Sequence, residues 1–273
     1  MRYSNPKKAP TLSHLFSLKS KSALVIGGAG LLGGEISYGL AELGAEIIVA
    51  SRDLKKTSEF VRNLSEKIPG KHLALEVDII SSESIENLFA SISQANEGKL
   101  DILVNCGMVG RKNTFDSISD KDWDADIEVG LNGVFRTIKA ASPLLAKQKG
   151  VILSIASMYG HVAPDHRMYD SEKYANPPSY GVAKAGVIQL TKYISSFLAP
   201  QGIRANCISP GPFPYETTQI ENPEFIARLG NKNPLERIGA PHEIKGAAAL
   251  LCSDASSYMT GQNICVDGGW SVW

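Results

Sequence analysis

The feature that most restricts the fold of this chain is an alternation of short apolar runs with longer amphipathic stretches, beginning at residue 23. Runs rich in β-branched residues, each followed by about ten or more residues of helical periodicity, predict βαβ crossovers. We therefore expect an α/β fold of three layers, a doubly wound parallel sheet of about seven strands with helices on both faces. The expected strands span residues 23–26, 46–50, 72–77, 102–105, 151–155, 203–208 and 263–266. The expected helices span residues 32–43, 54–67, 82–95, 122–147, 180–198, 223–229 and 241–251.

The alternation shows no second start, repeat or linker, so we expect a single domain over residues 1–273. Residues 1–20 lack the continuous apolar segment of a secretion signal and are expected to form an N-terminal arm. Residues 161–179 are rich in Pro, Asp, His, Arg and Tyr and follow no regular period. Such a stretch inside a compact domain is commonly a binding loop, and we expect it near the active site.

Composition restricts the partners and the compartment. Acidic and basic residues balance at 28 each, which disfavours nucleic acid and anionic membranes as partners. No apolar run approaches the ~20 residues that cross a bilayer. The four cysteines show no metal-ligand spacing, so no metal site and a reducing, cytoplasmic location are expected. They are Cys106, Cys207, Cys252 and Cys265.

A glycine-rich turn follows the first expected strand and reads Gly27-Gly28-Ala29-Gly30-Leu31-Leu32-Gly33. Glycine allows the tight turn, the close approach of backbone to a diphosphate, and the packing of the helix on the strand. The amides at the start of the following helix favour an anion. Gly27, Gly30, Leu32 and Gly33 are therefore candidates to hold the diphosphate of a dinucleotide.

The tip of the second expected strand carries the residues that would read the adenosine ribose. An acidic residue there would bind the 2′-hydroxyl of NAD. The tip offers Ser51 and Arg52, a donor and a cation suited to a 2′-phosphate, which favours NADP over NAD. The alternative is that Arg52 is solvated and Asp53 reads the ribose.

Three residues form a candidate catalytic set. Tyr180 and Lys184 lie four apart at the start of a helical segment, so both side chains share one face. A nearby ammonium lowers the pKa of a phenol and brings proton transfer closer to the working range. Ser157 follows the fifth expected strand, where ligands bind in open α/β sheets, and its hydroxyl could polarise a carbonyl.

Further motifs extend this set. They are Asp78 after the third strand, Asn105 after the fourth, Pro210-Gly211 after the sixth, and Thr260-Gly261-Gln262 with Val266-Asp267-Gly268-Gly269 at the end of the chain. With the glycine turn and the Ser157, Tyr180 and Lys184 set, they resemble the short-chain dehydrogenase/reductase superfamily, in its shorter single-domain branch, which has a Rossmann fold. The nearest resemblance is to sugar and sugar-acid dehydrogenases of the gluconate type. It also implies a homotetramer.

The resemblance implies roles for these residues. Tyr180 would be the general acid/base, Ser157 would position the substrate oxygen, and Lys184 would hold the nicotinamide ribose and lower the Tyr180 pKa. The remaining cofactor contacts implied are Asp78, Ile79 and Asn105 on the adenosine side and Pro210 and Gly211 beside the nicotinamide.

A second Tyr-x-x-x-Lys pair, Tyr169 and Lys173, competes with the first. Its distance from Ser157 is closer to the family's usual gap. However, Pro177-Pro178 would interrupt a helix that began at Tyr169, whereas the segment after Tyr180 is continuously helical. We therefore expect Tyr180 to be catalytic and the segment ahead of it to contain an insertion.

Four positions depart from the family pattern. Ile26 replaces a threonine ahead of the glycines, Cys106-Gly107-Met108 replaces Asn-Ala-Gly, and Tyr215 stands near an expected threonine, for which Thr217 could substitute. Gly130 replaces an asparagine that takes part in the family's proton relay. This last departure bears on catalytic efficiency and leaves cofactor binding untouched.

The leading functional hypothesis is an NADP- or NAD-dependent oxidoreductase that interconverts an alcohol and a carbonyl. A sugar, sugar acid or polyol is the expected substrate, and the polar insertion residues could contact it. They are His161, Asp165, His166, Arg167 and Lys173. The alternatives are a dinucleotide sensor with little catalysis, and an amino-sugar dehydrogenase or an epimerase of a surface-glycan pathway.

Overall fold

The computed structural model describes residues 9–95, 97–107, 111–171 and 174–272, and its centre is one parallel sheet. The strand order is β3-β2-β1-β4-β5-β6-β7, and every neighbouring pair is parallel. This confirms the expected doubly wound Rossmann-type fold. The strands are β1 (Ser22–Ile26), β2 (Glu46–Ser51), β3 (Leu73–Glu76), β4 (Ile102–Asn105), β5 (Val151–Ile155), β6 (Arg204–Pro210) and β7 (Asn263–Val266).

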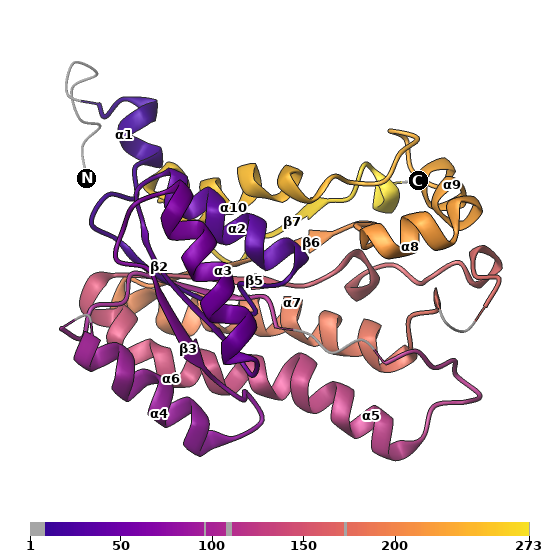
Figure 1. The fold of residues 1–273 in the computed structure, drawn as a ribbon, viewed down its shortest axis with the longest axis horizontal. Helices are drawn as coiled ribbons and strands as arrows, with labels where there is room; N and C mark the ends of the chain where they lie inside the picture. The colour runs from indigo at the N-terminus through magenta and orange to yellow at the C-terminus, as the bar shows by residue number, and fades with distance from the viewer. Residues whose placement is uncertain (1–8, 96, 108–110, 172–173, 273) are drawn as a thin grey trace.

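Helices cover both faces of the sheet (Figure 1). On one face lie α2 (Leu31–Glu42), α3 (Leu54–Lys67) and α10 (Ile244–Cys252). On the other lie α4 (Ser82–Ala95), α6 (Gly133–Gln148) and α7 (Pro178–Leu198). The central strands β1, β4 and β5 are buried along their whole length, which explains their continuous apolar runs.

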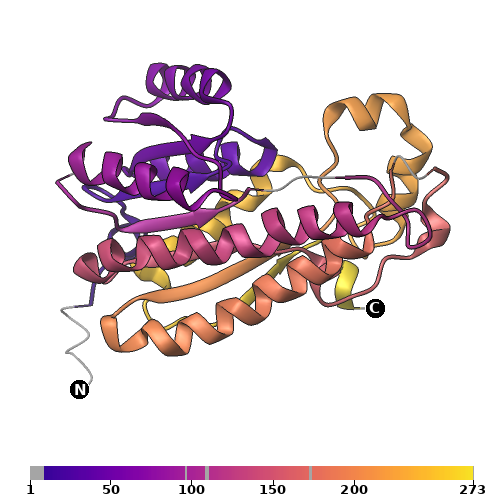
Figure 2. The same cartoon turned by 90° about the horizontal axis from the view of Figure 1, so that it is seen from below.

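The expected helix over residues 122–147 is three elements rather than one. It comprises α5 (Asp120–Ile127), a π-helical turn (Glu128–Asn132) and α6. The turn inserts too little length to disturb the apolar periodicity, so the sequence pattern could not reveal it. Figure 2 shows α5 and α6 as one long rod that runs beside α7.

Two short helices were not expected from the sequence. They are α1 (Leu12–Phe16) in the N-terminal arm and α8 (Glu216–Glu221), whereas α9 (Pro223–Asn231) lies where the helix over residues 223–229 was expected. Elements of five or six residues are too short to show a hydrophobic period.

The described part of the 161–179 insertion packs against α9. Asp165 pairs with Lys232 at 3.2 Å, and Asp170 pairs with Arg228 at 2.6 Å. Met168 is buried with Phe225 and Leu229 of α9 in one apolar cluster. The insertion is therefore joined to the segment that follows β6, at the carboxyl end of the sheet.

Parallel register gathers the site at that same edge. Ile26 lies beside Asn105, Asn105 beside Ser154, and Ile155 beside Ile208. The glycine turn and the residues that follow β4, β5 and β6 consequently emerge next to one another, which is where ligands bind in open α/β sheets.

Candidate active site

The glycine turn has the backbone geometry that the motif requires. Gly27 has φ of 74°, in the left-handed region, and Gly30 is the N-cap of α2. A Cβ on Gly33 would collide with the carbonyl oxygen of Gly27. The strand end and the first turn of α2, which includes Leu32, thus approach as closely as glycine permits, with the helix amides facing the turn.

At the tip of β2, the side chains of Arg52 and Asp53 have different surroundings. The Asp53 carboxylate caps α3 by accepting from the Lys56 amide at 2.9 Å. The Ser51 hydroxyl lies 2.7 Å from that of Thr57. Arg52 is exposed, so its guanidinium can reach a ligand at the strand tip.

Asn105 presents a free donor at the end of β4. Its side-chain oxygen accepts from Thr137 at 2.8 Å, while its buried Nδ2 group has no acceptor among the described residues. The Asp78 carboxylate accepts from the Ile80 amide at 3.3 Å, and the Ile79 side chain fills the space beside Gly133. An open glycine cradle and an unsatisfied buried amide at the same sheet edge fit a dinucleotide.

The structure brings Ser157, Tyr180 and Lys184 together. Ser157 follows β5 and is hydrogen-bonded to the Tyr180 side chain. The Lys184 ammonium donates to the Ile155 carbonyl oxygen at 2.8 Å and lies 5.8 Å from the centre of the Tyr180 ring. A phenol, a hydroxyl and an amine therefore converge on one point.

Burial dominates the proton affinities of this set. It raises the pKa of Tyr180, and the hydrogen bond from Ser157 opposes that rise. The expected lowering of the Tyr180 pKa by Lys184 is therefore wrong in its net direction, because burial of the phenol outweighs the effects that favour the phenolate. Burial lowers the pKa of Lys184 to about 8. Burial also raises the pKa of the Cys106 thiol to about 11, against the attraction of Lys184. The charge of Lys184 therefore acts on Cys106, an interaction that was not expected from the sequence.

Tyr169 takes a different position from Tyr180. It follows a short 3-10 turn, and its hydroxyl lies 2.8 Å from that of Tyr159. Lys173, its partner in the competing motif, lies outside the described residues. Tyr169 is thus beside the candidate catalytic set, and the phenol bonded to Ser157 is that of Tyr180.

Aromatic side chains line the space beside Tyr180. Tyr180 packs on a cluster that we call the aromatic wall, which consists of Tyr159, Tyr169, Tyr174, Phe225 and Trp270. Tyr174 stacks on Phe225 with ring centres 5.0 Å apart, and Tyr159 meets the edge of Trp270 at 6.4 Å. The wall joins the insertion, the turn after β5, α9 and the C-terminal segment.

The charged insertion residues are largely committed to one another. Asp165 accepts from both Arg167 and Lys232, which depresses its pKa. The Arg167 side chain is 87% exposed. His161 lies 3.5 Å from the Cys265 sulfur. Among the described residues no group of His, Cys, Asp or Glu is arranged to hold a metal ion.

Pro210 and Gly211 lie where β6 meets the end of β7. The Gly211 amide donates to the Val266 carbonyl at 2.9 Å, and a Cβ on Gly211 would lie 2.6 Å from the Asp267 backbone. The buried Asp267 carboxylate in turn binds the Gly269 and Ser271 amides, both at 3.0 Å. The two strands therefore form one fixed border of the site.

Gly130 lies in the π-helical turn and is buried against α7. A Cβ added there would lie 3.0 Å from the Ala183 Cβ, next to Lys184. Asn132 cannot replace the missing asparagine, because its amide is bound to Glu128 at 2.5 Å.

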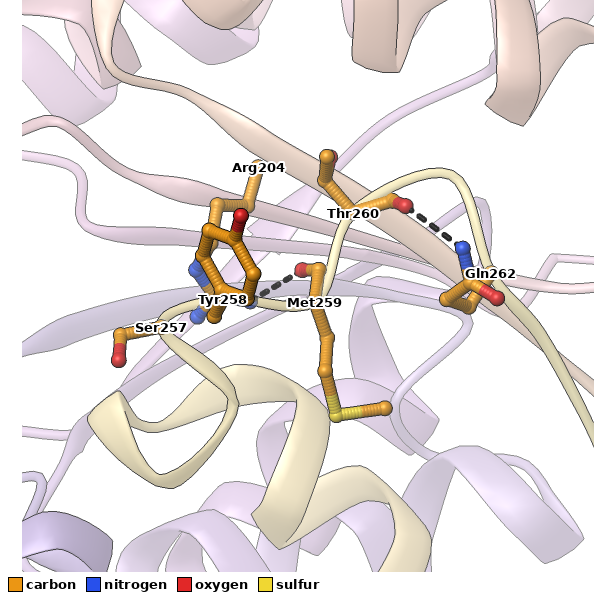
Figure 3. Close-up of a pocket in the computed structure, with 6 residues that line it drawn as sticks. All are labelled: Arg204, Ser257, Tyr258, Met259, Thr260 and Gln262. Atoms are coloured by element: carbon orange, nitrogen blue, oxygen red, sulfur yellow. Dashed lines mark hydrogen bonds between the residues drawn. The ribbon is translucent and has the colours of Figure 1, made fainter.

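A surface pocket of about 490 Å³ lies at the end of the sheet where β6 begins, opposite the candidate site (Figure 3). It is lined by Arg204, Ser257, Tyr258, Met259, Thr260 and Gln262. Arg204 begins β6, whereas Pro210 ends it at the candidate site. The Arg204 guanidinium binds the carbonyls of Leu251, Ser253 and Met259, so it fastens the chain there.

The fold and the site together define a dinucleotide-dependent oxidoreductase. The family model described as enoyl-(acyl carrier protein) reductase matches residues 29–271. The chain belongs to the short-chain dehydrogenase/reductase superfamily, and it is an NAD(P)-dependent oxidoreductase acting on CH–OH groups.

Proteins that are similar to this chain are named after different substrates. A tropinone reductase homolog of Arabidopsis thaliana is 34% identical over 262 residues, covering 94% of this chain and 81% of the relative. A 3-oxoacyl-(acyl-carrier-protein) reductase of Staphylococcus aureus is 32% identical over 256 residues, covering 92% and 98%. A gluconate 5-dehydrogenase from Burkholderia cenocepacia, solved in complex with NADP and tartrate, is 28% identical in sequence and superimposes with a TM-score of 0.87. The superposition covers 96% of this chain and 100% of the dehydrogenase.

For the described residues, no helix is both long and apolar enough to span a membrane.

Proposed function

We propose that Tyr180 is the general acid/base of this oxidoreductase, with Ser157 positioning the substrate oxygen and Lys184 assisting. In the reductive direction the Tyr180 hydroxyl donates a proton to the substrate oxygen, and in the oxidative direction the phenolate accepts one. The Ser157 hydroxyl donates to the same oxygen. The meeting of these groups at the carboxyl end of β5 supports the assignment.

The nicotinamide cofactor would supply the hydride-transfer chemistry when bound. Its diphosphate would lie on Gly27, Gly30, Leu32 and Gly33, and its nicotinamide side would border Pro210 and Gly211. Asp78, the Ile79 amide and the free Asn105 donor would serve the adenosine side. Lys184 would also bind the nicotinamide ribose.

We expect Tyr180→Phe to lower kcat by about 10²- to 10⁴-fold, because the proton carrier is removed while the ring remains. A panel of sugar acids, polyols and their carbonyl forms, followed by cofactor absorbance, measures this. Tyr169→Phe is the comparison, and it should raise KM while turnover persists. The reverse result, loss of turnover with Tyr169→Phe alone, would transfer the acid/base role to Tyr169.

NADP is the preferred cofactor in this proposal. Arg52 and Ser51 at the tip of β2 are available to a 2′-phosphate, whereas the Asp53 carboxylate is engaged in capping α3. The NADP complex of the similar gluconate 5-dehydrogenase supports this preference.

Removal of the Arg52 guanidinium tests that preference. Arg52→Ala should weaken NADP binding about ten- to hundredfold, as expected for loss of charge-assisted hydrogen bonds, and leave NAD binding unchanged. Quenching of protein fluorescence by each dinucleotide gives the two Kd values. Arg62→Ala, at an exposed position on the following helix α3, is the matched control. Equal weakening of NAD and NADP would contradict the assignment.

The proposed substrate is a sugar, sugar acid or polyol. The half-buried rings of Tyr169 and Tyr174 in the aromatic wall offer apolar faces for C–H groups, and the Tyr169 hydroxyl offers a hydrogen bond. Asp165 and Asp170 are paired within the protein, so the tyrosines are the better candidates for substrate contacts. An amino sugar would make the same contacts with the aromatic wall, so it is included in the assay panel.

Two other functions give distinct results in the same assays. A dinucleotide sensor would bind NADP, turn over no substrate, and respond to no Tyr180→Phe change. An epimerase would retain its cofactor through purification and show no net redox change.

We also propose a cytoplasmic homotetramer, supported by the free thiols of all four cysteines and by the exposed aromatic pair described below.

A further inference from the structure

A buried carboxylate on α5 joins two other segments of the chain. Asp126 is 6% exposed. Its Oδ1 accepts from Arg111 Nη1 at 2.9 Å, and its Oδ2 accepts from the Ser179 hydroxyl at 2.7 Å. Arg111 comes from the connection between β4 and α5, and Ser179 comes from α7. Because a buried carboxylate needs both charge and hydrogen-bond partners, this arrangement holds the three segments together.

Ser179 places this contact at the start of the candidate catalytic helix. It lies in the first turn of α7, directly before Tyr180, and is completely buried. The N-cap of α7 is Pro177, which provides no side-chain capping bond. The first turn of a helix has amides without internal partners and is the part most prone to fray. The bond from Ser179 to Asp126 therefore restrains the turn that a cap would ordinarily hold.

We propose that Asp126 is a positioning residue, which, held by Arg111, fixes the first turn of α7 so that the Tyr180 hydroxyl stays within hydrogen-bond reach of Ser157. This rests on the proposed function, in which Tyr180 transfers the proton. Asp126 touches neither Tyr180 nor Ser157 in any recorded hydrogen bond, so its influence passes through Ser179 and the helix backbone.

Loosening this turn has a predictable electrostatic result. The titratable groups facing Tyr180 are Lys184 on its own helix, Cys106 after β4, and Tyr159 and Tyr169 on the aromatic wall. The hydrogen bond from Ser157 lowers the Tyr180 pKa. If the phenol drifts from Ser157, its pKa rises, and less phenolate is present for alcohol oxidation at a given pH.

Ser179→Ala is the principal test, because it removes the bond without burying a new charge. We expect kcat to fall about five- to tenfold, in line with modest misplacement of a reacting group, with KM for substrate and Kd for NADP within about twofold. The rising limb of kcat for alcohol oxidation should move to higher pH. Ser179→Thr keeps the hydroxyl and should restore both kcat and the pH at which kcat for oxidation rises. Asp126→Asn keeps an acceptor oxygen but loses the charge that pairs with Arg111. Its kcat should therefore lie between the values for Ser179→Ala and the unmodified protein.

The matched control is Asp122→Asn. Asp122 is the other carboxylate on α5 that pairs with Arg111, at 3.3 Å, but it is 37% exposed and makes no bond to α7. Its removal should change kcat by less than about twofold. Ultraviolet titration of the phenolate, taken as the difference from Tyr180→Phe, reports the Tyr180 pKa without turnover and should move upward in Ser179→Ala.

The outcomes separate this proposal from the proposed function. Loss of thermal stability in Ser179→Ala and Asp126→Asn, with kcat, pH profile and phenolate titration unchanged, overturns the positioning role. Full turnover in Tyr180→Phe instead overturns the proposed function itself. Unchanged kcat in Ser179→Ala alongside an inactive Tyr180→Phe rejects only the role of Asp126.

Discussion

Lys184 is an amine almost completely withdrawn from water, and it donates a hydrogen bond to the Ile155 carbonyl oxygen. Withdrawal from water disfavours the ammonium form and lowers the pKa to about 8. With this pKa the amine is mostly protonated at neutral pH and loses its proton as the pH rises through about 8. The same withdrawal makes the folded state sensitive to pH.

The pH dependence of stability has a definite sign. The folded pKa is about 8 and the ordinary value is 10.5, so the unfolded chain binds more protons in this window, and stability rises as pH increases from 8 to 10. Lys184→Met, which carries no charge, should lack this rise, so its free energy of unfolding relative to the unmodified protein should fall by about 2 kcal/mol across the window. Urea unfolding at several pH values measures it. Lys192→Met, exposed on the same helix, should retain the full rise; a flat difference for Lys184→Met would contradict the burial argument.

Single residues were predictable from the sequence where spacing along one element carries the information. The separation of Tyr180 from Lys184 places both on one helical face, and the position of Ser157 follows from the end of a strand. Contacts between distant segments were not predictable. Ser179 and Asp126 are 53 residues apart, and nothing in either local pattern indicates that they meet. The interaction of Cys106 with Lys184 was missed for the same reason.

At the scale of elements, the strands were predicted to within two residues at each end, because each is a short apolar run closed by turn residues. The π-helical turn between α5 and α6 was missed, since one widened turn leaves the apolar face continuous. The turn lies at a close contact with α7, where a Cβ on Gly130 would lie 3.0 Å from the Ala183 Cβ.

Gly130→Ala should therefore destabilise the protein, although alanine ordinarily stabilises a helix. The new Cβ would lie 3.0 Å from that of Ala183, and overpacking of this kind costs about 1–3 kcal/mol. Thermal unfolding followed by circular dichroism measures the change, and Gly130→Ala with Ala183→Gly should recover most of it. Gly246→Ala in α10 is the control, because nothing lies within 4 Å of its added Cβ and it should stabilise by up to about 1 kcal/mol. Equal effects at the two glycines would show that the approach of α7 is not the cause.

At the scale of the whole molecule, the sheet order follows from the βαβ alternation, and the two apolar layers on either side of it account for most buried residues. The joining of the insertion to α9 was not predictable, because it depends on ion pairs between segments about 60 residues apart. The surface of α7 carries a further whole-molecule feature. Tyr193 and Phe197 stack with ring centres 6.0 Å apart, and each is 64% exposed.

We propose that this exposed aromatic pair, on a helix whose other face packs in the core, contacts a second copy of the chain. Light scattering coupled to size exclusion should give the mass of a tetramer, four times the 29.3 kDa of the chain. Phe197→Glu should reduce that mass, because a carboxylate at a self-complementary contact is desolvated and faces its own copy. Tyr258→Glu, a fully exposed aromatic in the turn before β7, should leave the mass unchanged. Tyr193 and Phe197 lie near the far end of α7, whose first turn contains Tyr180. A monomeric Phe197→Glu that retains NADP binding but loses turnover would therefore show that assembly holds the catalytic helix in place. A tetramer that survives Phe197→Glu would place the contact elsewhere on the molecule.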